Sequence, residues 1–318
     1  MYKIGVDLGG TNIVAGVVDE DYRIVGRGIA KTLRTRSREE IIDDIKEAIR
    51  TAMGYARVEI SDISSIGIGT PGTVNRADGV IEYASNLDFE NVPMKEIMEE
   101  EFKIPVYLEN DANCAALGEA VAGVGNGVDD FIAVTLGTGV GAGIVLNGQI
   151  LHGCNDAAGE IGHTVIVADG ERCPCGRRGC WEAYASATAL IRQTKDKMSK
   201  HFDTIMWDIC NGNIREVNAE TAFQAMRDGD TAAREVINKY VYYLSVGIVN
   251  IINTFQPKIL CIGGGIGNEG EELLAPIRYY VNNEHYSIHA KNQTIICSAV
   301  LGNDAGVIGA ALLETQNS

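Results

Sequence analysis

The chain has 318 residues, which is long enough for two domains with separate hydrophobic cores. Hydrophobic residues make up 46% of it and charged residues 22%, both ordinary for a globular protein, and the formal net charge is -16. Nucleic acids and anionic membranes bind basic surfaces, so this charge argues against both as the main partner.

The N-terminal residues do not have the pattern of a signal peptide, because a strand-like run, Ile4–Val6, begins almost at once. No apolar stretch approaches the ~20 residues that a membrane span requires. We therefore expect a cytoplasmic chain, and we expect its eight cysteines not to be paired in disulfides.

The first part of the chain alternates between strand and helix patterns. Apolar residues recur at helical spacing in Glu39–Met53, and Ser37 with Glu40 three residues later forms a capping-box pattern. In chain order we predict strands at Lys3–Leu8, Asn12–Val18 and Arg23–Ala30, the helix Glu39–Met53, a strand at Ile63–Ile68, a helix at Met94–Phe102, a short strand at Val106–Leu108 and a helix at Ala112–Ala122.

A second copy of the opening pattern begins at Phe131. The predicted strand Phe131–Leu136 leads into a glycine loop, Gly137–Gly141, and a returning strand, Ala142–Leu146, which ends in a tight Asn147-Gly148 turn. This internal duplication predicts two related α/β domains that face each other across a cleft. Further along we predict helices at Tyr184–Lys200, Ala219–Asp228, Thr231–Phe255 and Asp304–Thr315, and strands at Ile259–Ile262 and Thr294–Ser298.

The glycine hairpins are the first candidate site. In Asp7-Leu8-Gly9-Gly10-Thr11 the backbone N–H groups would face an anion, and the glycines would let a phosphate approach closely. Asp7 would suit a magnesium-bound water, although an ordinary hairpin would also explain it. The equivalent loop at Gly137 and a glycine run at 263–265 favour the phosphate interpretation. No Walker lysine follows, and a strand rather than a helix follows Gly10.

Asn110 and Asp111 lie between a predicted strand and a predicted helix. Asp111 is at or near the helix N-cap, and that role alone would explain a single aspartate. Alternatively, its carboxylate accepts a proton from a substrate hydroxyl that attacks a phosphate, with Asn110 fixing a hydroxyl beside it. The residues by themselves leave both interpretations open.

The most specific pattern combines His163 with Cys173, Cys175 and Cys180. Three thiolates and one imidazole complete a tetrahedral Zn²⁺ site with no open position, which predicts a structural rather than a catalytic ion. Free thiols or a redox pair are the alternatives, but Cys-x-Cys is not the thioredoxin spacing. Such a metal loop would hold nearby side chains in fixed places.

Three further polar residues are candidates for a sugar site. Glu160 lies three residues before His163, and Glu182 lies two residues after Cys180. Together with Asn86 these carboxylates would read neighbouring sugar hydroxyls. Taken singly, each of the three is explained equally well as a surface residue.

In combination, these motifs resemble the ROK family (repressors, open reading frames, kinases). The resemblance covers essentially the whole chain and is carried by the segments 7–11, 109–113, 136–141, 160–163 and 173–182. It implies a duplicated, actin-like fold of the ribonuclease H type, with a small α/β domain at residues 1–110, a large one at 111–303 that contains a zinc loop at 163–182, and a C-terminal helix, 304–318, that packs back on the small domain.

The resemblance also implies an activity, namely ATP-dependent phosphorylation of a hexose at its 6-hydroxyl, with glucose as the first substrate and Asp111 as the base. Mg²⁺ would accompany ATP, the domains would close over the substrates, and the chain would form a homodimer or homotetramer. The implied ATP site is Asp7, Gly9, Gly10, Thr11, Asn12, Gly137, Thr138, Gly139, Gly264 and Gly265. The implied sugar site is Asn86, Asn110, Asp111, Glu160, His163 and Glu182, with His163 also on zinc.

Three alternatives remain from the sequence. The substrate is another sugar, such as N-acetylmannosamine, N-acetylglucosamine, fructose, mannose or allose. A sugar-responsive repressor would carry an N-terminal helix-turn-helix domain, which we do not expect because the phosphate loop begins at residue 7. A sugar sensor without activity would be expected to lack the base, and Asp111 is present.

Overall fold

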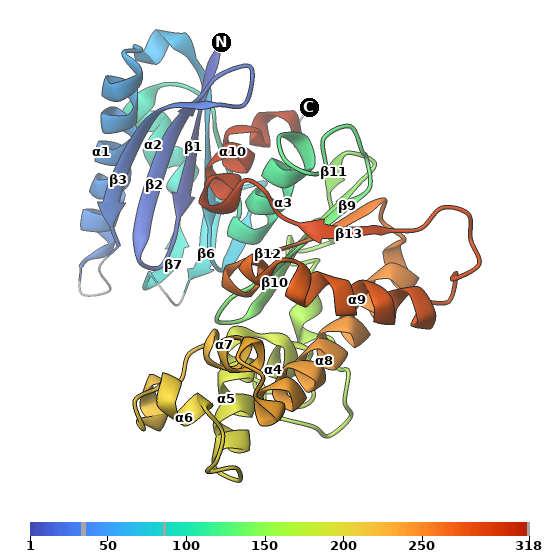
Figure 1. The fold of residues 1–318 in the computed structure, drawn as a ribbon. Helices are drawn as coiled ribbons and strands as arrows, with labels where there is room; N and C mark the ends of the chain where they lie inside the picture. The colour runs from blue at the N-terminus through green and yellow to red at the C-terminus, as the bar shows by residue number, and fades with distance from the viewer. Residues whose placement is uncertain (33–35, 85–86, 317–318) are drawn as a thin grey trace. The chain divides into compact units, whose positions relative to one another are not determined.

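The computed structural model describes residues 1–32, 36–84 and 87–316 and contains two compact units (Figure 1). The first unit comprises Met1–Ala133, Gly143–Gly159 and Ala299–Ser318, and the second comprises Val134–Ala142 and Glu160–Ser298. The fold is mixed α/β, as the sequence predicts, and includes two five-stranded sheets.

The first sheet has the strand order β3-β2-β1-β4-β8. Its strands are β1 (Tyr2–Leu8), β2 (Asn12–Val18), β3 (Ile24–Lys31), β4 (Ile63–Thr70) and β8 (Val106–Asn110). The first three form antiparallel hairpins, whereas β4 pairs parallel to both β1 and β8. The carboxyl ends of β1, β4 and β8 therefore lie at the same edge of the sheet. The candidate site residues Asp7 and Asp111 lie at that edge.

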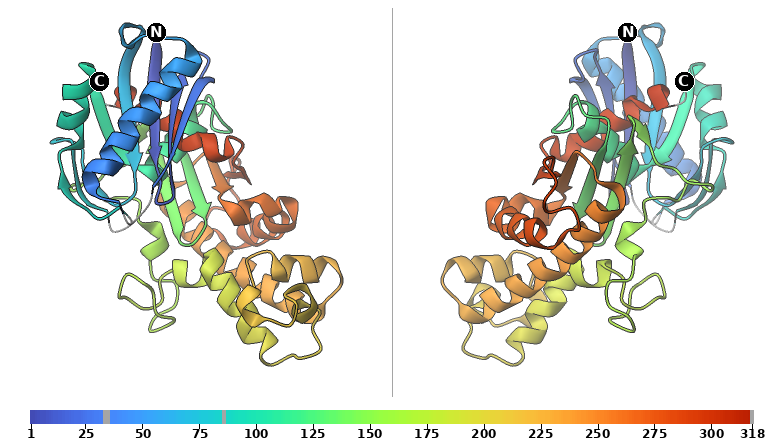
Figure 2. Two further views of the ribbon diagram at one scale, coloured as in Figure 1. Left: turned by 90° about the vertical axis from the view of Figure 1, so that its left-hand side faces the viewer. Right: turned by 90° about the vertical axis from the view of Figure 1, so that its right-hand side faces the viewer.

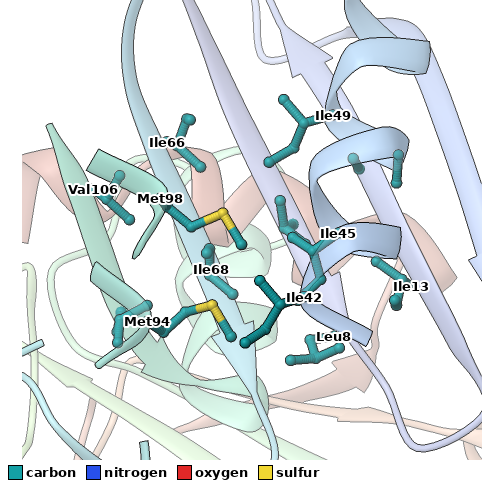
Figure 3. Close-up of a cluster of buried hydrophobic side chains, with 14 of the residues drawn as sticks. Leu8, Ile13, Ile42, Ile45, Ile49, Ile66, Ile68, Met94, Met98 and Val106 are labelled. Atoms are coloured by element: carbon teal, nitrogen blue, oxygen red, sulfur yellow. The ribbon is translucent and has the colours of Figure 1, made fainter. Parts of the chain in front are cut away.

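One face of this sheet is covered by α1 (Arg38–Ala56) and α2 (Met94–Phe102). Side chains alternate along a strand, so every second residue of β1 joins the hydrophobic core beneath these helices. Figure 3 shows Leu8 of β1 together with Ile45 of α1 and Met98 of α2 in this core. Figure 2 shows α1 lying across the strands, and the predicted capping box of Ser37 and Glu40 is confirmed at its start.

The other face of the sheet is covered by α10 (Ala305–Ala311), whose backbone lies directly on the strands. A Cβ atom on Gly5 would lie 1.8 Å from the carbonyl oxygen of Val307, and one on Gly67 would lie 1.8 Å from that of Ala310. Glycine at these two strand positions is therefore what allows the helix to approach. The predicted helix Asp304–Thr315 is wrong at its end, because a 3-10 turn at Leu313–Gln316 follows α10.

The second sheet repeats the plan of the first, with the strand order β11-β10-β9-β12-β13. Its strands are β9 (Phe131–Leu136), β10 (Val140–Leu146), β11 (Gln149–Ile150), β12 (Ile259–Gly263) and β13 (Ile295–Ser298). In both sheets three strands that are consecutive in sequence are followed by two later, mutually parallel strands. Positive φ angles at Asn147 (52°) and Gly148 (73°) make the tight hairpin turn. The predicted duplication is confirmed by this topology.

A small third sheet was not predicted. Its strands, in the order β5-β6-β7, are β5 (Thr73–Asn75), β6 (Val80–Ala84) and β7 (Phe89–Val92). They are only three to five residues long, and β6 and β7 mix buried and exposed positions without alternation, so their sequence has no clear strand periodicity.

The remaining helices are α3 (Asp111–Val121), α4 (Glu182–Ala185), α5 (Ala187–Met198), α6 (Met206–Ile209), α7 (Thr221–Arg227), α8 (Thr231–Phe255) and α9 (Glu271–Glu284). The single predicted helix Tyr184–Lys200 is wrong, because Ser186 is extended and caps α5 by accepting from the Ala189 N–H. Helix α9, which contains Pro276, was not predicted. Within the described residues, no helix combines the length and the apolar character needed to cross a membrane.

Candidate functional site

The hairpin between β1 and β2 is closed by its own backbone. The Gly9 N–H donates to the Asn12 carbonyl at 2.9 Å, so it is not available to an anion. The Thr32 hydroxyl donates to the Gly9 carbonyl at 2.8 Å, and the Thr32 N–H donates to the Thr11 carbonyl at 2.9 Å. Across the described ranges, the N–H groups of Gly10 and Thr11 have no protein acceptor. These two groups are the ones that this hairpin can offer to a phosphate.

Asp7, at the end of β1, and Asp111, at the start of α3, form a carboxylate pair in the first unit. Burial, and secondarily the charge of Asp111, raises the pKa of Asp7 to about 6. Burial also raises the pKa of Asp111, although hydrogen bonds from nearby donors oppose the shift. Cys114 lies nearby, and its thiol pKa is held well above its usual range by burial and by the charges of Glu109 and these two aspartates. The pair is therefore poised to take up protons more readily than solvated carboxylates.

The cap of α3 is Asn110 rather than Asp111. The Asn110 side-chain oxygen accepts from the N–H groups of Ala112 (2.9 Å) and Asn113 (3.3 Å), and Asp111 is the first helical residue. The sequence left capping and catalysis open for Asp111. Asn110 therefore performs the capping, and Asp111 Oδ1 additionally accepts from the Ala112 N–H at 2.9 Å.

The corresponding hairpin of the second sheet lies in the second unit. Its loop is closed by a Gly137 N–H bond to the Gly139 carbonyl at 3.0 Å, and Glu182 accepts from the Val140 N–H at 3.1 Å. Gly264 lies against the end of β9, since a Cβ atom there would be 2.5 Å from the Leu136 carbonyl oxygen. The structure thus brings the second and third predicted glycine motifs together, with Glu182 beside them.

The predicted metal ligands converge. The ligand atoms of His163, Cys173, Cys175 and Cys180 all lie within 4.8 Å of one another. The Cys175 and Cys180 sulfurs are 3.7 Å apart, and His163 Nδ1 is 3.5 Å from the Cys173 sulfur. A tetrahedral zinc with Zn–S bonds of about 2.3 Å and a Zn–N bond of about 2.0 Å requires separations of roughly 3.8 and 3.5 Å. The cluster therefore fits a closed zinc site.

The loop that carries the cluster has a defined local structure. Positive φ angles at Gly176 (89°) and Gly179 (81°) turn the chain between the cysteines. Cys173 and Cys180 are buried and pack with Tyr184 in a small hydrophobic cluster, while Cys175 is exposed. One side of the metal site is thus anchored in the protein interior, and the other lies at the surface.

Two glutamates, Glu160 and Glu182, lie close to the candidate metal ligands. Glu160 Oε2 lies 4.0 Å from His163 Nε2, the ring nitrogen that does not face the thiols. Glu182 Oε1 lies 3.5 Å from the Cys173 sulfur. Three of the predicted sugar-site residues, Glu160, His163 and Glu182, are therefore neighbours through the metal cluster. Asn86, another predicted sugar-site residue, lies outside the described residues.

The sequence interpretation missed one part of the site. His152, which has no pattern partner in the sequence, lies 2.7 Å from the buried carboxylate of Glu109, and Arg76 lies 3.1 Å from the same oxygen. These residues are 43 and 33 positions from Glu109 along the chain. No local spacing signal could have found this contact.

The duplicated sheets, the glycine hairpins and the closed His-Cys₃ cluster define a two-domain α/β protein of the actin-like class with a structural metal loop. The family model that describes the ROK family matches residues 3–317, and the chain belongs to that family.

Individual relatives differ in what they do. The chain is 38% identical to a glucokinase of Halalkalibacterium halodurans, with 99% of this chain and 95% of the relative aligned. It is 34% identical to a ROK family glucokinase from Streptomyces griseus, solved in complex with glucose and AMPPNP; that match covers 98% of this chain and 99% of the other, with a TM-score of 0.81. It is also 32% identical to a xylose repressor of Caldicellulosiruptor bescii, over 96% of this chain and 76% of the repressor.

Proposed function

We propose that this protein is an ATP-dependent sugar kinase that transfers the γ-phosphoryl group to the 6-hydroxyl of a hexose, with glucose as the preferred substrate. The observation that carries the proposal is Asp111, a carboxylate of raised pKa that follows the capping residue Asn110 at the first turn of α3. The similarity to glucokinases along nearly the full chain supports the choice of glucose.

In the proposed reaction, Asp111 accepts the proton of the sugar 6-hydroxyl as its oxygen attacks the γ-phosphorus. A carboxylate of raised pKa suits this task, because a stronger base takes the proton more readily at neutral pH. The N–H groups of Gly10 and Thr11 in one hairpin, and Thr138 and Gly139 in the other, would bind the phosphates.

Mg²⁺ would neutralise charge on the β- and γ-phosphates when ATP is bound. Asp7, a carboxylate beside the first hairpin, would hold one of its waters. The ion's charge would also favour ionised Asp7 and so offset the burial that raises the pKa of this group. Gly264 and Gly265 would lie near the adenosine.

The sugar would be bound by Asn86, Asn110, Glu160, His163 and Glu182. Zinc on His163 Nδ1 would leave Nε2 to face a sugar hydroxyl, and the metal loop would hold the two glutamates in place. The zinc ion is structural in this proposal, since the cluster offers four protein ligands and no open position.

A coupled ADP-release assay over glucose, mannose, fructose, allose, N-acetylglucosamine and N-acetylmannosamine tests the proposal. We expect the highest kcat/KM with glucose and a product that glucose-6-phosphate dehydrogenase oxidises. Turnover of an N-acetylhexosamine alone would support the proposed kinase activity but show that glucose is not the substrate. If the protein binds sugar but releases no ADP with any of these sugars, the result would support a sugar-sensing regulator and overturn the proposed kinase activity. That the chain forms a homodimer or homotetramer stays a prediction.

A further inference from the structure

Glu109 is a buried carboxylate whose two oxygens each have two partners. Its side chain is 1% exposed. Oε1 accepts from the Asn110 backbone N–H at 2.9 Å and from the Asn113 side-chain amide at 3.0 Å. Oε2 lies 2.7 Å from His152 Nε2 and 3.1 Å from Arg76 Nε. Charged hydrogen bonds of this kind in a buried place are strong, and losing one leaves the carboxylate undersatisfied.

The two partners of Oε1 flank Asp111. Asn110 precedes it and caps α3, and Asn113 follows it in the first helical turn. Glu109 thus holds both sides of the turn on which Asp111 is carried. A shift of the Glu109 carboxylate would shift the Asn110 backbone and the Asn113 side chain together, and Asp111 lies between them.

The two partners of Oε2 come from distant parts of the chain. Arg76 lies just after β5, and His152 lies just after β11. The two segments are also joined to each other, because the Arg76 N–H donates to Asp156 Oδ2 at 3.2 Å. The His152 carbonyl accepts from the Ala158 N–H at 2.9 Å, which holds the segment that contains Asp156 against His152.

We infer that Glu109, His152 and Arg76 form a positioning network that sets the orientation of the Asp111 turn, an inference that rests on the proposed kinase reaction. His152 does not contact the reacting atoms in this scheme. It acts through Glu109, by holding Oε2 so that Oε1 faces Asn110 and Asn113. Small displacements of a catalytic group have large effects on rate, so the network acts mainly on kcat, with a smaller effect on sugar binding through Asn110.

The test compares His152→Ala with His152→Gln in the full-length protein. Glutamine places an amide N–H near the position of Nε2, so it can still donate to Glu109, whereas alanine cannot. We expect His152→Ala to lower kcat by about 10- to 100-fold, with a smaller rise in the KM for sugar because Asn110 moves with the turn. We expect His152→Gln to recover most of that loss. His289→Ala, at an exposed histidine in the second unit, is the matched control and should keep wild-type kinetics.

A second readout is independent of turnover. Hydrogen exchange of the Asn110, Ala112 and Asn113 amides should be faster in His152→Ala than in wild type, and His152→Gln should restore protection. Wild-type kcat in His152→Ala, or equal kcat losses in the Ala and Gln variants, would overturn the network. If the wild-type protein phosphorylates no sugar, the proposed function fails, and the exchange of these amides still decides whether the network positions this turn.

Discussion

Replacing Asp7 with asparagine should make this protein more stable and less active. Burial and the neighbouring charge of Asp111 raise the Asp7 pKa from 3.8 to about 6. The ionised carboxylate is therefore disfavoured in the folded state relative to the unfolded state. A shift of about two units corresponds to roughly 3 kcal/mol, because each unit is worth about 1.4 kcal/mol. Asparagine carries no charge and avoids this cost.

The sign of the pH dependence follows from the same pKa values. Below pH 3.8 both states of wild-type Asp7 are protonated, and the group contributes no pH dependence. Between 3.8 and about 6 the unfolded state loses its proton while the folded state keeps it, so this group lowers stability as the pH rises. Above about 6 the loss is complete. The advantage of Asp7→Asn should therefore grow through this window and then level off.

Urea unfolding of wild type and Asp7→Asn, without Mg²⁺ or nucleotide, at several pH values between 4 and 8 measures this difference. The expected result is a stability gain in the variant that reaches up to about 3 kcal/mol near neutral pH, together with loss of phosphoryl transfer. Asp203→Asn, at an exposed aspartate of the second unit, is the control and should show neither effect. A difference in stability that does not change with pH would refute the reasoning.

Three other changes have defined outcomes. Asp111→Ala should lower kcat at least about 100-fold while calorimetry still detects sugar binding, and near-wild-type turnover would remove Asp111 as the base. Elemental analysis should find about one zinc per chain, and Cys175→Ser should lose the metal and raise the sugar KM; a metal-free chain that is folded and active would contradict the zinc proposal. Gly5→Ala should cost at least about 3 kcal/mol in urea unfolding, because its Cβ would meet the Val307 carbonyl at 1.8 Å; a loss below 1 kcal/mol would show that α10 can move away.

The parts of the fold that sequence predicts are those with a local signal. The capping box at Ser37, the two-residue turn at Asn147-Gly148 and the cysteine spacing each depend on residues within a few positions of one another. The strands that feed the glycine hairpins are buried runs whose repetition indicates the duplication. Short segments encode these features, so the sequence already identifies them and the three-dimensional structure adds only their distances and angles.

The parts that sequence does not predict depend on contacts between distant segments. The Glu109 contacts with His152 and Arg76 have no spacing rule, because the segments are brought together only by the folded sheet. The break at Ser186 shows a related limit. Apolar periodicity continues through this residue, yet its hydroxyl accepts from the Ala189 N–H and so caps a new helix. The spacing of apolar residues does not show where a polar residue ends one helix and caps the next.

The division of roles between Asn110 and Asp111 connects the fold to the proposed chemistry. A helix start at the carboxyl end of a parallel strand needs a capping acceptor, and an aspartate in that role would give its oxygens to backbone N–H groups and have its pKa lowered. Here Asn110 supplies the cap without a charge, and burial raises the pKa of Asp111. The Asp111 carboxylate stays basic because its burial outweighs the hydrogen bonds from the Ala112 N–H and the Asn110 side chain, which lower its pKa. Exchanging the two residues would keep a capped helix but place the charge on the cap, where it would be a weaker base.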